Sequence, residues 1–314
     1  MRHCACFLLL FLILTQCTSI SSSLQKSNSN KIKEFLLSLD LEEEFLLEFF
    51  FRSLIQEDSI GYVLIGGKPM GFYSYLKPKA VVNSHHFGPV ENIDLFFRAF
   101  DEDHALFQKG WEIWKKYAYR FCGNNLIFDF FDQNLEVHYV KVAVINKRLF
   151  LSTLDQNKKQ FSKIEPSLMD KNLLFDALMN NEETKKKFYS RHDLLGICLG
   201  YGQKNADLFQ QMSLTLTSSG KLGYTLEIPS LDHLRDLEQK WNTLKHSFNS
   251  GLKDRTSRKF LFTVGLGFRV DQSIPETSML QHKYTELRKK LTQEYSDGDF
   301  LQKTLELIVL ADQG

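Results

Sequence analysis

The stretch Gly61–Tyr75, GYVLIGGKPMGFYSY, indicates the class of fold. Two runs rich in aromatic and β-branched residues flank Gly66–Pro69, and this arrangement is typical of a turn between two antiparallel strands. The stretches Leu126–Asp132 and Glu136–Leu154 repeat the pattern, and the second is expected to turn near Asn146. Because the strands come in adjacent pairs rather than alternating with helices, we predict an α+β fold whose antiparallel sheet is built from hairpins and packed with several helices.

Helical periodicity surrounds these runs. Apolar residues recur every three or four positions over residues 31–56 and 90–121, which predicts helices. Further helices are expected from about 166 to 212, over 230–248 and 276–295 and after 299, and further strands over 214–228 and 258–270. No long linker or internal repeat divides residues 31–314, so we expect a single domain there.

Composition excludes one class of partner. The chain of 314 residues is 43% hydrophobic and 25% charged, as globular proteins are. Its 39 basic and 38 acidic residues leave no basic surplus for nucleic acid. We therefore expect no nucleic-acid partner.

Residues 1–17, MRHCACFLLLFLILTQC, have the pattern of a secretory signal. Arg2 supplies the basic start, and an uncharged apolar run follows from Cys4 to Thr15. That run would be about 18 Å long as a helix, against about 30 Å of membrane hydrocarbon, so a spanning helix is the weaker interpretation. The sequence predicts export.

Leu14–Cys17, LTQC, resembles the bacterial lipoprotein signal, which implies that Cys17 becomes the lipidated first residue. Gln16 departs from that signal, which has a small residue there; the alternative is an ordinary signal cleaved between residues 18 and 23. Residues 18–30 are rich in Ser and Asn and predict a flexible tether. The expected location is the cell envelope, with the protein either membrane-anchored through the lipid or released as a periplasmic or secreted form.

Two cysteines remain after this signal, Cys122 and Cys198. An oxidising compartment would allow one disulfide between them. We favour two buried free thiols, because Cys198 lies in an apolar helical run where cysteine behaves as a small hydrophobic residue.

Three glycines lie close together in Ser190–Phe209, SRHDLLGICLGYGQKNADLF. Ser190 followed by Asp193 fits a capping box, which predicts a helix starting at residue 191. Gly196 and Gly200 then lie one turn apart on one face, where a second helix can approach closely.

The same glycines have a second interpretation, a phosphate-binding loop with Lys204 as its counter-charge. Their spacing, GxxxGxG, matches neither GxGxxG nor GxxxxGK[ST], and it follows a helix rather than a strand. We therefore predict a helix–helix corner.

Few other residues suggest chemistry. His85 and His86 are weak candidates for a metal site, because adjacent residues of a strand face opposite ways. Asp101, His104 and His192 are weak candidates for acid–base catalysis. The sequence contains neither HExxH nor GxSxG, and no cofactor is expected.

Gly61–Tyr75 and Leu194–Phe209, LLGICLGYGQKNADLF, resemble segments of uncharacterised exported proteins, some expected to be lipoproteins, of chlamydia-like intracellular bacteria. The short signal sequence is similar too. The resemblance implies export from a bacterial cell and implies no particular activity.

Two functions follow as hypotheses. The first is an exported, envelope-tethered binding or interaction protein whose partner is a protein or a small molecule. The alternative is an exported hydrolase whose site assembles from dispersed residues such as His85, Asp101, His104 and His192. The lack of catalytic motifs favours the first.

Overall fold

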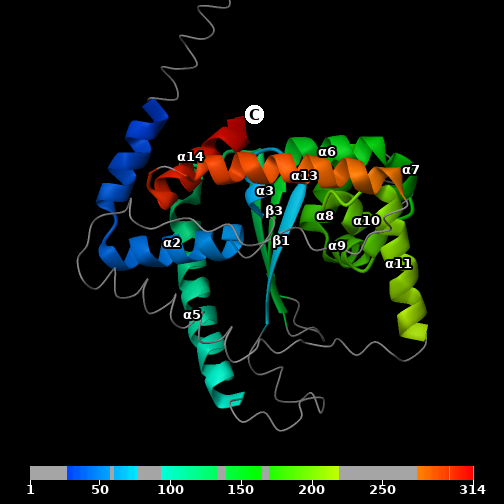
Figure 1. Ribbon diagram of the computed structural model, residues 1–314, viewed down its shortest axis with the longest axis horizontal. Helices are drawn as coiled ribbons and strands as arrows, with labels where there is room; N and C mark the ends of the chain where they lie inside the picture. Colours follow the sequence, from blue (N-terminus) through cyan, green and yellow to red (C-terminus); the bar gives the residue numbers. More distant parts are fainter. Residues whose placement is uncertain are drawn as a thin grey trace, which may run out of the picture.

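The computed structural model describes residues 27–56, 60–76, 93–132, 139–164, 170–218, 274–296 and 298–313. Within them the fold is α+β, as predicted, with one three-stranded antiparallel sheet and helices on both of its faces (Figure 1). The predicted signal with Cys17, the pair His85 and His86, and the segments expected over 230–248 and 258–270 lie outside the described residues.

The strands are β1 (Met70–Leu76), β2 (Leu126–Asp132) and β3 (Tyr139–Asn146). The helices expected near 276–295 and after 299 are confirmed. In chain order the helices are the one over residues 27–38 (the 27–38 helix), α2 (Leu41–Gln56), α3 (Ile60–Leu64), α5 (Ile93–Tyr117), the 3-10 helix η1 (Ala118–Arg120), α6 (Lys147–Gln156), α7 (Lys158–Phe161), α8 (Lys171–Asn180), α9 (Glu182–Tyr189), α10 (His192–Cys198), α11 (Gln203–Ser218), α13 (Pro275–Glu294) and α14 (Phe300–Gln313).

The sheet has the order β1-β3-β2, so β3 is central and pairs antiparallel with both neighbours. Side chains of a strand alternate between its faces. Val142 and Val144 accordingly join one hydrophobic core, and Ala143 and Ile145 join another. The sheet therefore separates two layers, each with its own core.

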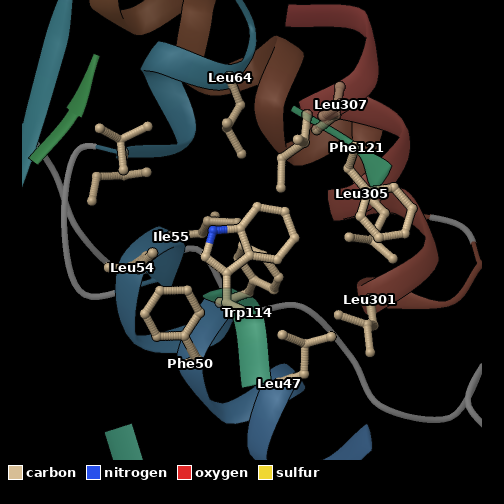
Figure 2. Close-up of a cluster of buried hydrophobic side chains, with 14 of the residues drawn as sticks. Leu47, Phe50, Leu54, Ile55, Leu64, Trp114, Phe121, Leu301, Leu305 and Leu307 are labelled. Carbon is tan, nitrogen blue, oxygen red and sulfur yellow. The ribbon is translucent and has the colours of Figure 1, made fainter. Parts of the chain in front are cut away.

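The first layer, here called the aromatic layer, comprises the 27–38 helix, α2, α3, α5 and α14. Trp114 of α5 is fully buried at its centre (Figure 2). The Trp114 ring centre lies 5.0 Å from that of Phe51 and 5.1 Å from that of Phe128. Gly110, one turn earlier, lets α5 approach α2 closely, because an added Cβ would collide with the Leu46 carbonyl oxygen.

The second layer, here called the local layer, comprises α6 to α11, which follow one another in the chain. Phe150 of α6 is fully buried there and packs edge-on against Phe175, with ring centres 5.6 Å apart. Lys185 of α9 reaches the sheet, and its Nζ lies 3.2 Å from the Asp129 carboxylate of β2. An ion pair thus links this layer to the edge of the sheet.

The hairpin predicted around Gly66–Pro69 is wrong on its first side, because residues 60–64 form α3. Gly66 has a φ of 71°, and the Gly67 amide donates to the Tyr62 carbonyl at 2.7 Å. This is the glycine-based ending of a helix rather than a turn between strands. Only the second side, β1, is a strand as expected.

The second predicted turn, near Asn146, begins a helix instead. The Asn146 side chain accepts a hydrogen bond from the Leu149 amide at 3.1 Å and caps α6. Because this cap satisfies a backbone amide at the start of a helix, the chain continues as the helix Lys147–Gln156 rather than as a second strand. Residues 214–218 are likewise the end of α11, although a strand was expected there.

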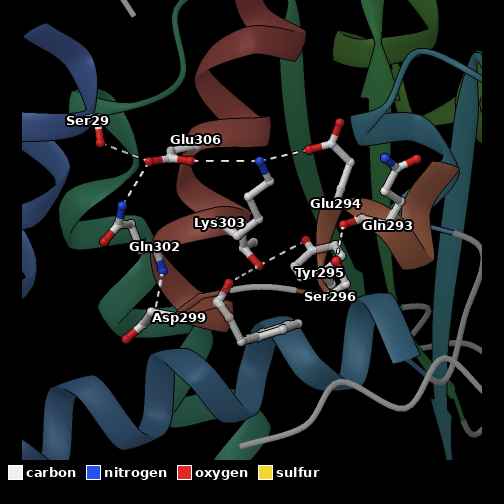
Figure 3. Close-up of polar contacts among 11 residues, drawn as sticks. Ser29, Gln293, Glu294, Tyr295, Ser296, Asp299, Gln302, Lys303 and Glu306 are labelled. Carbon is white, nitrogen blue, oxygen red and sulfur yellow. Dashed lines mark hydrogen bonds and ion pairs between the residues drawn. The ribbon is translucent and has the colours of Figure 1, made fainter. Parts of the chain in front are cut away.

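A polar network joins the 27–38 helix to α13 and α14 (Figure 3). Ser29 donates a hydrogen bond of 3.0 Å to Glu306 of α14. Lys303 lies 2.7 Å from Glu294 of α13 and 4.0 Å from Glu306. Residues 27–30 are therefore part of the folded body, although the sequence predicted a flexible tether up to residue 30.

Candidate functional site

The glycine-rich segment Ser190–Phe209 forms the predicted corner between α10 and α11. A Cβ added to Gly196 would lie 2.8 Å from the Ala206 Cβ, so the glycine permits this helix crossing. Gly200 and Gly202 have φ values of 77° and 79° and turn the chain between the helices. The interpretation as a helix–helix corner is confirmed.

The predicted capping box at the start of this corner is wrong. The Ser190 hydroxyl donates to the Lys187 carbonyl at the end of α9, and α10 begins at His192 without a side-chain cap. Asp193 instead pairs with the Arg191 guanidinium, whose Nε donates to it at 2.9 Å. Arg191 competes successfully for the carboxylate because a charge-assisted, two-pronged bond is stronger than a cap.

Helix α13 covers both glycine-rich turns. A Cβ on Gly61 would lie 2.6 Å from Leu291, and one on Gly67 would lie 2.6 Å from Leu287. Cβ atoms on Gly200 and Gly202 would collide with Tyr284 and Glu276. Each of these four glycines thus makes room for a different side chain of α13. We call these four glycines the glycine floor. Their contacts with α13 explain why Gly61–Tyr75 and Ser190–Phe209 are both rich in glycine.

A lysine lies between the two halves of the glycine floor. Lys68 is fully buried, and its Nζ is 5.0 Å from the ring centre of Tyr201 and 5.6 Å from that of Tyr284. A cation above aromatic rings is attracted by their negative faces. The ring centres of Tyr284 and Tyr62 are 5.7 Å apart, so three tyrosines surround the region.

The hydroxyl of Tyr284 joins α13 to the corner by donating a 2.7 Å hydrogen bond to the Gly200 carbonyl. Burial raises the pKa of Tyr284, and the neighbouring Tyr201 and Tyr62 raise it further. The phenol therefore keeps its proton and acts as a donor. The cluster of Lys68, Tyr201 and Tyr284 holds the two turns and α13 together.

Two carboxylates near the same corner differ in acidity. Burial raises the pKa of Asp193, but hydrogen bonds and charge from Arg191 outweigh it, so the net pKa is lowered. Burial raises the pKa of Asp207, and the charge of Asp193 raises it further. Asp193 thus remains ionised more readily than Asp207 does. Next to them the His192 ring packs edge-on against Phe209 with centres 5.4 Å apart.

The predicted catalytic residues lie on two helices that belong to different layers. Asp101 and His104 lie on α5, whose core residues belong to the aromatic layer. His192 lies on α10, which packs in the local layer on the other face of the sheet. Lys204 is exposed, and its backbone amide rather than its side chain contacts Glu276, at 3.1 Å.

The expectation of two buried free thiols is confirmed for Cys198, whereas Cys122 is free but only half-buried. Cys122 and Cys198 form no disulfide. Burial and the nearby Asp312 carboxylate raise the pKa of Cys122 to about 12, and burial raises that of Cys198 well above its usual range. Both thiols therefore stay protonated and unreactive near neutral pH.

Within the described ranges, no group of three His, Cys, Asp or Glu side chains is arranged to hold a metal ion. None of the helices in those ranges is both long and apolar enough to cross a membrane. A shallow hollow between α6, α7 and α8 has room for about one water.

Sequence reasoning missed the importance of Lys68 and Tyr284. In the sequence, the tetrapeptide GGKP is typical of an ordinary turn, and this pattern indicates no role for its lysine. A signal did exist in the later helix, where Thr277, Tyr284 and Leu291 recur every seven residues and are the buried positions of α13.

Comparison of the chain with protein-family models, with curated proteins and with solved structures finds no match.

Proposed function

We propose that this protein is exported from a bacterial cell, is anchored to an envelope membrane through Cys17, and binds an acidic protein partner with the outward face of α13. Export and anchoring are supported by the sequence of residues 1–17 alone. The binding role is supported by the surface chemistry of α13.

The outward face of α13 differs from the rest of a nearly neutral chain. Its exposed residues include four cations, of which Lys289 pairs with the single exposed carboxylate, Glu286, at 2.7 Å. Met279 is 74% exposed near one end of the same helix. Of these cations, Lys283 and Lys290 lie four and eleven residues after Met279 and therefore on the same side of the helix. Cations beside a flexible apolar side chain fit a partner that carries carboxylates around an apolar contact. The cations of α13 are Lys283, Arg288, Lys289 and Lys290.

The glycine floor gives this face a fixed shape. Leu291 packs above Gly61, Leu287 packs above Gly67, and the Tyr284 hydroxyl donates a hydrogen bond to the Gly200 carbonyl. Because the inward side chains are held in this way, the outward ones start from a defined helix rather than a flexible segment. A preformed surface loses less entropy on binding.

Cross-linking in cells tests the binding role. A photoreactive residue at Met279 should give a discrete adduct with one protein, and the same residue at Leu173 of α8, which is 56% exposed, should not. Replacing Lys283 and Lys290 with Glu should reduce the adduct, whereas the same change at the exposed Lys159 and Lys186 should not. Equal adducts at 279 and 173 would contradict the proposal.

Fatty-acid labelling tests the anchor separately. The wild type should incorporate label, and Cys17→Ala should not, with a mature amino terminus at residue 17 by mass spectrometry. A mature start between residues 18 and 23 without label would leave export intact and remove the anchor. A protein that starts at Met1 in the cytosol would contradict both.

A further inference from the structure

Large apolar side chains are exposed where the 27–38 helix meets α2. Leu37 is 80% exposed and Leu41 is 59% exposed, on either side of the bend between these helices. Tyr119 of η1 is 73% exposed. We call these three residues and the segments that carry them the apolar corner.

Aromatic contacts place the three segments together. The Phe35 ring of the 27–38 helix lies 5.0 Å from that of Tyr117 and 4.9 Å from that of Phe121, which bracket η1. Glu43 of α2 accepts a 2.8 Å hydrogen bond from Lys116 of α5. The segments that carry Leu37, Leu41 and Tyr119 therefore meet at one junction.

The 27–38 helix has an inner and an outer face. Ile32, Phe35 and Leu36 point into the aromatic core and are buried. Lys33 and Leu37 are both exposed and lie four residues apart, so they share the outer face. A lysine beside apolar and tyrosine side chains is typical of surfaces that rest at a membrane interface, where the long lysine stem reaches back to water.

Chain length limits how far this corner can be from an anchor at Cys17. Nine residues separate position 17 from Ser27, the first residue of the 27–38 helix, so ten Cα–Cα steps join them. Ten such steps span no more than about 35 Å even when the chain is fully extended. If Cys17 carries lipid, the 27–38 helix is thus confined to the neighbourhood of the bilayer surface.

We infer that the apolar corner is the surface with which the folded body rests on the membrane, with the 27–38 helix lying along the bilayer and Leu37, Leu41 and Tyr119 at the level of the lipid headgroups. This inference rests on the proposed anchor at Cys17. The exposed Asp40 and Glu42 offset the positive charge of the nearby cations, so the contact depends on apolar side chains rather than on charge. We therefore expect it to persist at high salt, which weakens only exposed charge interactions.

This contact would orient the molecule. The apolar corner and the α10–α11 corner lie toward opposite ends of the long axis, at the left and right of the view in Figure 1. With the apolar corner on the bilayer, the start of α13, which lies toward the α10–α11 end in Figure 1, is distant from the membrane. That placement leaves the proposed partner face accessible.

Fluorophore quenching in vesicles tests the inference on the mature, full-length acylated protein. Leu37→Cys and Leu41→Cys are each labelled with an environment-sensitive fluorophore in vesicles of phosphatidylethanolamine and phosphatidylglycerol that contain a nitroxide headgroup lipid. Leu173→Cys on α8 is the matched exposed control. Cys122 and Cys198 react little with the label, because burial keeps their thiols protonated.

Quenching at positions 37 and 41 should be several-fold stronger than at 173 and should be unchanged in high salt. Acylation, measured in the same preparation by mass spectrometry, reports the anchor independently. Acylated protein with equal quenching at all three positions would overturn the membrane contact and leave the proposed function intact. Protein without acylation would overturn the anchor and, with it, this inference.

Discussion

On one face of the sheet, Trp114 is enclosed by segments as far apart in the chain as Leu47 and Leu305, whereas on the other Phe150 is enclosed by helices that follow one another from residue 147 onward. The aromatic layer is therefore held by contacts that exist only when the whole body is folded. The local layer is held mainly by neighbours in sequence, which are cheaper to bring together. The sheet is the boundary between these two kinds of packing.

Helix α13 connects what the sheet separates. Its Leu291 packs in the aromatic layer above Gly61, and its Thr277 donates a 3.2 Å hydrogen bond to Asn205 of α11. At 20 residues it is about 30 Å long, enough to pass over both layers (Figure 1). Its packing is therefore expected to couple the stability of the two layers.

The largest predicted effect is on the aromatic layer. Trp114→Ala removes a fully buried indole and should lower the free energy of unfolding by about 3–5 kcal/mol, the cost typical of large cavities. Denaturant midpoints measure it, with Tyr119→Ala as the control because that aromatic ring is exposed and should change stability by only about 0.5 kcal/mol. Equal effects of the two variants would show that Trp114 is not at the centre of the core.

A smaller effect distinguishes the two helix crossings. Gly110→Ala places a Cβ against the Leu46 carbonyl of α2, and backbone cannot move aside easily, so we expect a loss of about 1–3 kcal/mol. Gly196→Ala meets the Ala206 Cβ at 2.8 Å, where a small shift of α11 relieves the contact, so its loss should be less.

The control for both glycine variants is Lys204→Ala, which removes an exposed side chain and should change the free energy of unfolding by about 0.5 kcal/mol or less. Thermal unfolding of the three variants decides the order. A Gly196→Ala variant as stable as Lys204→Ala would reopen the loop interpretation of the α10–α11 corner.

The elements of the two layers differ in how well the sequence predicts them. Helices α8 to α10, most of α11, α13 and α14 were predictable, because apolar periodicity is a local property of the chain. Most of α6 was instead predicted as a strand. The segment Ile60–Leu64 was predicted as a strand, because β-branched and aromatic residues suit both a strand and a short buried helix. The helical conformation of this segment depends on tertiary packing, because Gly61 lies under Leu291, a residue 230 positions away. Lys68 and Tyr284 were missed for the same reason.

The smallest predicted effect concerns the two carboxylates at the α10–α11 corner. The folded pKa of Asp193 is lowered, so its contribution to stability is present above its unfolded pKa of about 3.9 and is lost as pH falls below it. The folded pKa of Asp207 is raised, so its ionisation opposes folding as pH rises. Asp193 is buried, but its partner Arg191 and Asp207 are partly exposed, so each effect should be about 0.2–1 kcal/mol.

Urea unfolding at pH 7 and at pH 3 separates the two contributions. Asp193→Asn should be less stable than the wild type at pH 7, and the difference should be smaller at pH 3, whereas Asp207→Asn should be slightly more stable than the wild type at pH 7. Opposite signs are required because the Arg191 guanidinium binds Asp193, and Asp207 experiences burial and the charge of Asp193. If both variants lower the free energy of unfolding equally at pH 7, the two carboxylates make the same contribution to stability, and the two act as parts of one hydrogen-bonded network.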